Sequence, residues 1–120
     1  RDGEILSTGY NSFPRGIDDD VPERQERPEK YYWFTHAELN GIVNAARIGV
    51  STKGSVMYMT CGIPCSDCAR AIINAGIEKI VCERTDVAKD KRWAKNAERS
   101  IVMFEEAGVE VAYYERAYNE

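Results

Sequence analysis

The sequence predicts an α/β fold, in which helices pack against a layered β-sheet. Short apolar stretches typical of strands alternate with longer stretches whose apolar residues recur at helical spacing. A glycine follows each of the three long predicted helices, as is common at helix C-termini. The chain has 120 residues, of which 43% are hydrophobic, and this is the size of one domain with one core. We therefore expect a single domain over residues 1–120, with right-handed crossovers between neighbouring parallel strands.

The first residues predict a hairpin turn and then a strand. Asp2-Gly3 is a strong two-residue turn signal, and residues 5–9 after it are typical of a strand. A hairpin needs two strands, whereas only Arg1 precedes this turn. We therefore expect a further strand upstream and regard the sequence as N-terminally incomplete.

Residues 11–30 predict a long loop, because the segment holds three of the four prolines and an acidic run. Loops of this length in a compact domain are uncommon and usually functional. The aromatic residues at positions 31–34 predict that the end of the loop is anchored, and a disordered insertion is the alternative. The basic residues here are candidate phosphate contacts or a solvated surface: Arg15, Arg24, Arg27 and Lys30.

The rest of the chain alternates between helix and strand. The predicted elements are a helix at 35–49, a strand at 55–60, a helix at 65–76, a strand at 77–83, a helix at 90–107 and a strand at 109–114. Leu39, Ile42 and Val43 give the first helix its apolar spacing. In the last helix the residues on one side are apolar: Trp93, Ala97, Ile101 and Phe104.

Charge and composition exclude several classes of protein. The 16 basic and 20 acidic residues give a formal net charge of −4, which disfavours a protein that grips a nucleic acid through many phosphate contacts. No run of 12 apolar residues is present and no signal-peptide pattern opens the chain, so we expect no membrane span and a cytoplasmic location. If the protein binds nucleotides, we expect small ones rather than a long polyanion.

Cysteine spacing points to a metal site. Of the four cysteines, Cys61, Cys65 and Cys68 fall within eight residues. In a reducing compartment such a cluster indicates metal binding rather than disulfides. The chain has one histidine, His36, so a site that combines Cys with His must use it.

Two helix starts carry the chemistry. His36-Ala37-Glu38 opens one predicted helix, and Pro64-Cys65-Ser66-Asp67-Cys68 opens the next. One imidazole and two thiolates suit tetrahedral zinc and leave the fourth position for water. Zinc lowers the pKa of that water, and Glu38 is placed to move its proton. This combination predicts hydrolytic deamination.

Each part of the pattern also has a simpler interpretation. A Cys-x-x-Cys pair alone is compatible with a redox pair or a structural half-site. Thr35-x-x-Glu38 matches a capping box, in which Glu38 would only stabilise its helix. Cys61 would close a Cys₃His structural zinc site with no open position and no turnover. Cys82 lies in an apolar strand and is predicted to be a buried small hydrophobe.

The motifs resemble those of the zinc-dependent cytidine and deoxycytidylate deaminase superfamily, whose signature is His-x-Glu followed by Pro-Cys-x-x-Cys. The resemblance narrows to the deoxycytidylate deaminases through three further segments. These are Gly9-Tyr10-Asn11-Ser12-Phe13-Pro14-Arg15-Gly16, His36-Ala37-Glu38-Leu39-Asn40, and Cys68-Ala69-Arg70-Ala71-Ile72-Ile73 with Gly76-Ile77.

The resemblance implies a zinc ion held by His36, Cys65 and Cys68, with Glu38 as the catalytic proton shuttle. The implied reaction converts the free nucleotide dCMP and water to dUMP and ammonia. Alternative substrates are cytidine, CMP, dCTP, guanine, a riboflavin-pathway pyrimidine or adenosine in tRNA. The resemblance also implies a homo-oligomer, while the composition and charge given above predict no membrane partner and disfavour a nucleic-acid partner.

The resemblance implies substrate contacts as well. Asn11 matches a position near the sugar, the backbone around Ala37 matches one that reads the pyrimidine edge, and Asn40 matches a position near the substrate. Two departures are visible: Ser12 replaces a glycine, and three residues rather than two separate Thr60 from Pro64. We therefore expect the turn before the cysteines to be reshaped.

The implied fold is a three-layer α/β/α arrangement with a five-stranded mixed sheet. Its N-terminal helix and first strand are expected to be missing from this sequence.

Overall fold

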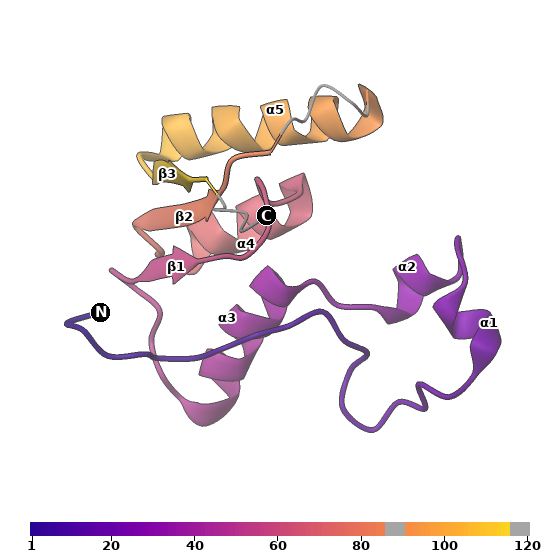
Figure 1. The fold of residues 1–120 in the computed structure, drawn as a ribbon. Coiled ribbons are helices and arrows are strands. Elements are labelled where there is room, and N and C mark those ends of the chain that lie inside the picture. The colour runs from indigo at the N-terminus through magenta and orange to yellow at the C-terminus, as the bar shows by residue number, and fades with distance from the viewer. Residues whose placement is uncertain (86–90, 116–120) are drawn as a thin grey trace, which may run out of the picture.

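The computed structural model describes residues 1–85 and 91–115, which form a parallel sheet with helices packed against it (Figure 1). The strands are β1 (Val56–Tyr58), β2 (Lys79–Glu83) and β3 (Glu110–Tyr114), in the order β1-β2-β3. The helices are α1 (Pro22–Gln25), α2 (Lys30–Trp33), α3 (Ala37–Ile48), α4 (Ser66–Asn74) and α5 (Lys91–Ala107). The predicted α/β class is confirmed, and Asp90 at the start of the predicted last helix lies outside the described residues.

One face of the sheet carries the core. In register, Met57 lies beside Ile80, and Ile80 lies beside Val111. Because alternate residues of a strand share a face, Ile80 and Cys82 point the same way, and both are fully buried. Helices α4 and α5 cover this face with buried side chains: Ala69, Ile72, Ala97 and Phe104. The prediction that Cys82 is a buried small hydrophobe is confirmed.

The other face of the sheet is uncovered in the part of the chain that the structure describes. None of the strand residues on this face is buried, and the Tyr58 side chain is 79% exposed. The described strands are three and all parallel. The expected five-stranded mixed sheet between two helical layers is therefore not what these residues form.

The segment predicted as a strand at residues 5–9 explains part of this difference. The turn before it is present: Asp2 and Gly3 have φ of 54° and 78°, and the Glu4 N–H donates to the Arg1 carbonyl over 2.9 Å. The segment then runs extended along α3 without forming a strand (Figure 1). The Ser7 hydroxyl donates to the Gly41 carbonyl over 2.7 Å, and the Asn44 amide donates to the Thr8 carbonyl over 2.9 Å.

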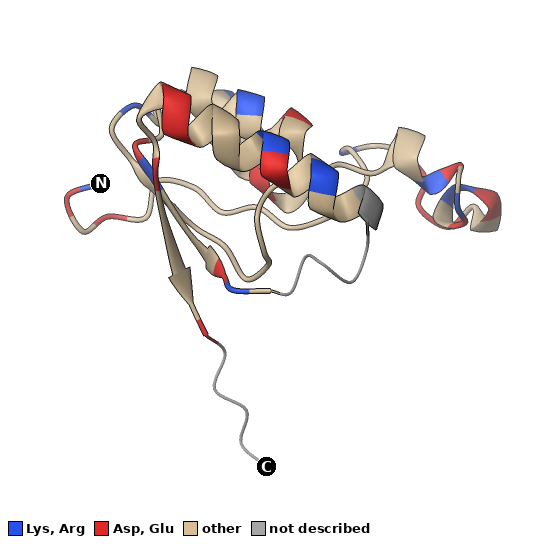
Figure 2. Ribbon diagram, turned by 90° about the horizontal axis from the view of Figure 1, so that it is seen from above, with Lys and Arg blue, Asp and Glu red and all other residues tan. Residues whose placement is uncertain are grey.

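The loop predicted at residues 11–30 is ordered by its own contacts and includes α1 and the start of α2. Ser12 and Thr35 form an antiparallel bridge, and the rings of Phe13 and Phe34 meet edge to face with centroids 6.0 Å apart. These contacts confirm that the aromatic end is anchored. Figure 2 shows the segment with α1 and α2 projecting beside the rest of the domain, with basic and acidic residues mixed on it.

The four candidate phosphate-binding cations of this segment already have partners. The Arg15 guanidinium donates to the Asn44 side-chain oxygen over 2.7 Å. The other three lie over aromatic rings, in the pairs Arg24 with Trp33, Arg27 with Tyr31 and Lys30 with Phe34. Arg15 therefore ties the loop to α3, and the other three cations pack within the segment that contains the loop and α2.

Within residues 1–85 and 91–115, no helix combines the length and apolar character that a membrane crossing requires.

Gly9 is the point where the N-terminal segment comes closest to α3. A Cβ atom at Gly9 would lie 2.4 Å from the Ala37 carbonyl oxygen and 2.4 Å from the Gly41 nitrogen, which are both backbone atoms. We predict that Gly9→Ala forces the segment away from α3 and lowers the free energy of unfolding by about 1–3 kcal/mol. Urea denaturation measures this change.

Gly41→Ala is the matched control, because its Cβ would meet only the Gly9 nitrogen at 3.9 Å. An alanine inside a helix is favoured over glycine by about 1 kcal/mol, so this variant should be as stable as the parent or more so. Equal unfolding midpoints for the two variants would contradict the close approach at Gly9.

Candidate functional site

Two helix N-termini meet at the predicted metal site. His36 is the N-cap residue of α3, and Cys65 is the N-cap residue of α4. The His36 Nδ1 atom lies 3.4 Å from the Cys65 Sγ atom and 3.5 Å from the Cys68 Sγ atom. Together these residues are a group whose ligand atoms all lie within 4.8 Å of one another. The structure thus brings the three predicted ligands to one point.

The chemistry and spacing of these ligand atoms fit zinc. One imidazole nitrogen and two thiolate sulfurs are a donor set that tetrahedral zinc prefers. With Zn–S of about 2.3 Å and Zn–N of about 2.0–2.1 Å, tetrahedral angles separate nitrogen and sulfur by about 3.6 Å. The distances of 3.4 and 3.5 Å agree with this value. Cys68 is buried while His36 is exposed, so one side of the site is accessible.

The pKa values of Cys65 and Cys68 shift in opposite directions, because ionisation of one thiol disfavours ionisation of the other. The Cys68 side chain and its backbone N–H, which donates to Cys65 Sγ over 3.5 Å, lower the pKa of Cys65 to about 5 against the opposing effect of burial. The pKa of Cys68 is raised, because a thiol beside the Cys65 thiolate, in a buried place and near Glu38, resists ionisation. A bound cation relieves this conflict, since both sulfurs bind a metal as thiolates.

Glu38 faces the ligand group from the first turn of α3. Its side chain is buried, with 9% exposed, and its Oε1 atom lies 3.5 Å from the Cys61 Sγ atom. The capping-box interpretation fails, because His36 rather than Thr35 is the N-cap residue, and the Thr35 N–H donates to the Ser12 carbonyl over 2.8 Å. The carboxylate is therefore available for chemistry beside the ligands.

Cys61 is beside the site but outside the ligand group. Among the described residues, the nitrogen and sulfur ligand group contains His36, Cys65 and Cys68 and does not include Cys61. Cys61 is exposed as a whole residue, and partial burial of its thiol together with the neighbouring Glu38 carboxylate raises the pKa of Cys61 to about 12. This geometry does not support the alternative of a closed Cys₃His site.

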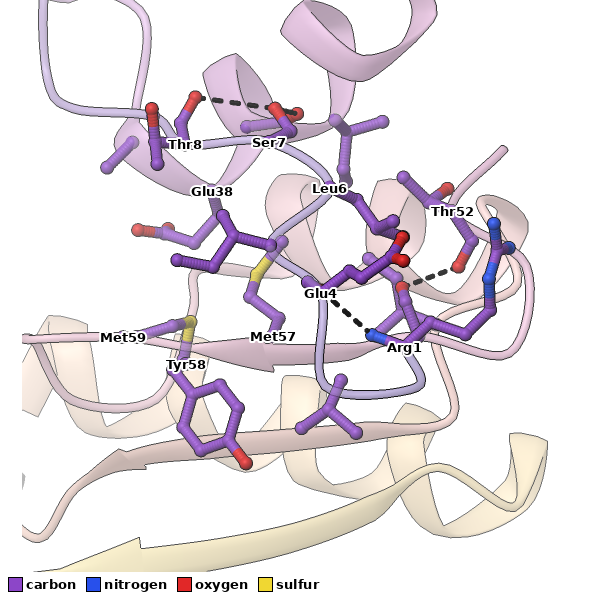
Figure 3. A pocket seen from close by; sticks show the side chains of 18 of the residues that line it. Arg1, Glu4, Leu6, Ser7, Thr8, Glu38, Thr52, Met57, Tyr58 and Met59 are labelled. Atoms are coloured by element: carbon purple, nitrogen blue, oxygen red, sulfur yellow. Dashed lines mark hydrogen bonds between the residues drawn. The ribbon is translucent and has the colours of Figure 1, made fainter. Parts of the chain in front are cut away.

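Two cavities meet at the site. One has a volume of about 380 Å³ and is lined by His36 and Cys65, together with Glu38, Asn11 and Trp93. The other has a volume of about 730 Å³ and lies between the N-terminal segment and β1 (Figure 3). Glu38 and Cys61 line both cavities. The smaller cavity is lined by two of the three ligand residues, His36 and Cys65, and has the size of a small-molecule pocket.

Of the predicted substrate contacts, Asn11 lines the smaller cavity, whereas Asn40 bonds the loop that carries Asn11. Asn11 lines the smaller cavity, and its Oδ1 atom accepts a hydrogen bond of 2.7 Å from the Ala37 N–H. The Asn40 amide donates to the Tyr10 carbonyl over 2.8 Å and to the Ser12 hydroxyl over 3.1 Å. Asn40 thus holds the loop that carries Asn11. The substrate roles of Asn11, Ala37 and Asn40 stay predictions.

Helix α5 supplies two supporting residues that the sequence analysis missed. Asn96 accepts a hydrogen bond of 2.8 Å from the Ser66 N–H, and the fully buried Ser100 hydroxyl donates to the Pro64 carbonyl over 2.7 Å. Loss of such a donor leaves a buried carbonyl unpaired, at a cost of about 1–3 kcal/mol. The available signal was two polar residues four apart on the apolar side of the predicted helix. Trp93, predicted to be on that side, lines the smaller cavity.

A family model matches this chain. The model described as the cytidine and deoxycytidylate deaminase zinc-binding region matches residues 1–84, which include all three ligands and Glu38.

Individual proteins give the same result. The chain is 37% identical over 109 residues to an uncharacterized deaminase in the luxG 3′ region of Aliivibrio fischeri, covering 91% of this chain and 71% of that protein. It is 38% identical over 85 residues to deoxycytidylate deaminase of Homo sapiens, covering 67% of this chain and 46% of that protein. The chain therefore spans about half the length of the human relative.

A solved structure is also similar. The crystal structure of dCMP deaminase from the cyanophage S-TIM5, in its apo form, matches with a TM-score of 0.69 and 28% sequence identity. The match covers 95% of this chain and 75% of that chain.

Zinc should stabilise the fold through this site. We predict one zinc ion per chain, because binding to the folded state alone adds to the free energy of unfolding. At a zinc concentration of a hundred times Kd, chelation should lower the melting temperature by roughly 10 °C. Calorimetry with and without a chelator, together with elemental analysis, measures both quantities.

Cys65→Ser and Cys68→Ser should lose zinc and the response to the chelator. Asp19→Asn is the matched control, because it removes a donor from the second, exposed group of potential ligands, Asp18, Asp19 and Asp20. Full zinc content in Cys65→Ser, or a loss in Asp19→Asn, would place the metal elsewhere.

Proposed function

The chain belongs to the cytidine and deoxycytidylate deaminase family, and from this premise we propose that it catalyses the hydrolytic deamination of dCMP to dUMP and ammonia. The observation that carries the proposal is the meeting of His36, Cys65 and Cys68 in one ligand group, beside a cavity that the buried Glu38 also lines. The named deoxycytidylate deaminases among the relatives support the choice of substrate.

Zinc is the cofactor of this family, and when it is held by His36, Cys65 and Cys68 it supplies the Lewis acidity that makes water nucleophilic near neutral pH. Glu38 accepts one proton from the attacking water and passes it to the ring nitrogen next to the attacked carbon, and it then carries the second proton of the water to the amino group, which leaves as ammonia. A C–O bond forms at the ring carbon as its C–N bond breaks. Glu38 ends each cycle ionised, ready for the next.

The surroundings of Glu38 suit this role. Its side chain is 9% exposed, so little bulk water competes for its proton. Its place in the first turn of α3 puts it one residue beyond Ala37, whose N–H is held by Asn11. We assign Asn11 and the Ala37 backbone to substrate contact on this ground, and Asn40 to support of the Asn11 loop.

The finer architecture is part of the proposal. The free edge of β1, the cavity of about 730 Å³ beside it and the uncovered sheet face support further strands and a second helical layer. We propose the five-stranded mixed sheet of a three-layer fold as the complete arrangement of the domain. The four cysteines are free, which supports a reducing, cytoplasmic location.

A homo-oligomer is supported by the exposed side of α3. Leu39 and Val43 are four residues apart on this helix, and their side chains are 37% and 46% exposed. Residues at this spacing form one apolar stripe on a helix, and an exposed apolar patch is typical of a protein interface.

Removal of the Glu38 carboxylate should lower turnover strongly while the zinc site and the fold are retained. We predict that Glu38→Gln retains zinc and thermal stability while kcat falls by about 100- to 10,000-fold, the range of general acid–base catalysis. Ammonia release from zinc-loaded protein is the measurement, with dCMP, CMP, dCTP, deoxycytidine, cytidine, guanine and adenosine tested in parallel.

Glu98→Gln is the matched control, because it neutralises an exposed carboxylate on α5. Turnover confined to dCMP supports the proposal, and turnover of another compound alone reassigns the substrate. Full activity in Glu38→Gln would overturn the mechanism.

A charge in the apolar stripe of α3 should separate the subunits. We predict that Val43→Glu shifts the protein from an oligomer to a monomer in sedimentation velocity, because association would bury the new carboxylate. Val102→Glu, at a 52% exposed position on α5, should leave the oligomer intact. A monomeric parent protein, or equal behaviour of both variants, would remove this interface.

A further inference from the structure

We propose that Cys61 is a positioning residue, which donates a hydrogen bond from its thiol to the Glu38 carboxylate and holds that carboxylate toward the metal ligands. The inference rests on the proposed function, because it gives Cys61 a role in the same reaction. The contact that carries it joins the Cys61 Sγ atom to the Glu38 Oε1 atom over 3.5 Å, within the range for a hydrogen bond that involves sulfur.

The backbone fixes where the Cys61 thiol lies. The Met59 N–H donates to the Val81 carbonyl and the Glu83 N–H donates to the Cys61 carbonyl, both over 2.9 Å. Backbone hydrogen bonding between β1 and β2 therefore continues past the end of β1 as far as Cys61. This anchoring is independent of the metal ligands, which lie at the start of α3 (His36) and at the start of α4 (Cys65 and Cys68).

The residue after Cys61 is also confined. A Cβ atom at Gly62 would lie 2.5 Å from the Thr85 Oγ1 atom, so the chain passes Thr85 closely at this point. Three residues separate Thr60 from Pro64 in this sequence. The turn therefore has room to present Cys61 to Glu38 and still deliver Cys65 to the ligand group.

The chemistry of the pair sets the direction of the hydrogen bond. The Cys61 Sγ atom is the donor and the Glu38 Oε1 atom the acceptor of this contact, and a thiol with an ordinary pKa of about 8.5 already keeps its proton at neutral pH. An ionised carboxylate can only accept, which makes the S–H group the donor. A carboxylate oxygen offers more than one acceptor position, so the bond leaves capacity for the proton that the reaction moves.

The position of Glu38 between two cavities shows why it needs to be held. Its carboxylate belongs to a side chain with three rotatable bonds, and Glu38 and Cys61 line both the 380 Å³ cavity and the 730 Å³ cavity. Figure 3 shows the Glu38 side chain at the edge of the larger cavity. Without a partner, the side chain is free to turn into that space and away from the ligand group. The thiol opposes this rotation.

Two substitutions at Cys61 test the proposal in zinc-loaded protein. Cys61→Ala removes the donor and should lower kcat for dCMP by about tenfold, the effect of losing one hydrogen bond to a charged group. KM should stay within about twofold, because substrate binding does not use the thiol. Cys61→Ser is the matched control, since its hydroxyl also donates to a carboxylate, and it should retain most of the parent kcat.

A double-mutant cycle separates positioning from other roles. If Cys61 acts through Glu38, Cys61→Ala should cause no further loss of kcat in a Glu38→Gln background. The same four proteins should show a non-additive change in the urea midpoint, which reports the contact without any turnover. An unchanged kcat in Cys61→Ala, equal losses in the Ala and Ser variants, or full additivity overturns the proposal.

Metal content separates this role from that of a fourth ligand. Cys61→Ala should retain one zinc ion, and the cobalt-substituted variant should retain the full thiolate-to-metal charge-transfer band. A loss of zinc or of part of the band would make Cys61 a ligand and overturn the proposal. Absence of parent turnover on every substrate overturns the proposed function, and with it the catalytic role of Cys61. The urea cycle then reports by itself whether the contact exists.

Discussion

The convergence of two helix N-termini on one point is the constraint on which the rest of the structure depends. Each helix contributes its N-cap residue, His36 from α3 and Cys65 from α4. A helix start presents unpaired N–H groups and positive partial charge, which favour a thiolate at this position. The Cys68 N–H accordingly donates to the Cys65 sulfur. The backbone thus prepares one ligand for the metal, while the other residues hold the two helix starts at the required separation.

Residues outside the ligand group maintain this separation from both sides. On the α4 side, Ser100 and Asn96 of α5 bond the turn and the first residue of the helix. On the α3 side, Asn11 accepts from the Ala37 N–H, and Asn40 holds the loop that carries Asn11. These are mostly hydrogen bonds between a side chain and the backbone, which fix the helix ends without filling the cavity. The site is therefore rigid at its base and accessible at its mouth.

The Glu38 carboxylate, which lies beside the metal ligands, needs a hydrogen-bond partner that holds its orientation. The Glu38 side chain is buried, where a polar group without a partner is costly, and in the proposed reaction it moves a proton. A weak donor such as a thiol stabilises the charge without competing strongly for it. The contact with Cys61 supplies such a donor. The larger cavity beyond the pair makes the orientation of Glu38, and not only its presence, a property that the fold has to maintain.

The sequence by itself determined the α/β class, the order of the main helices and strands, and the ligand set, because amphipathic period, helix-end signals and Cys and His spacing are local properties of the chain. Only the tertiary structure decided which partners distant residues take. Residues 5–9 have a strand-like pattern but lie along α3, where the Asn44 side chain bonds the Thr8 carbonyl and the Ser7 hydroxyl bonds the Gly41 carbonyl. Glu38 has capping-box spacing but bonds Cys61, and Ser100 looks like an ordinary helix residue but supports Pro64. Each choice depends on which surfaces meet across dozens of residues, and no local pattern encodes that meeting.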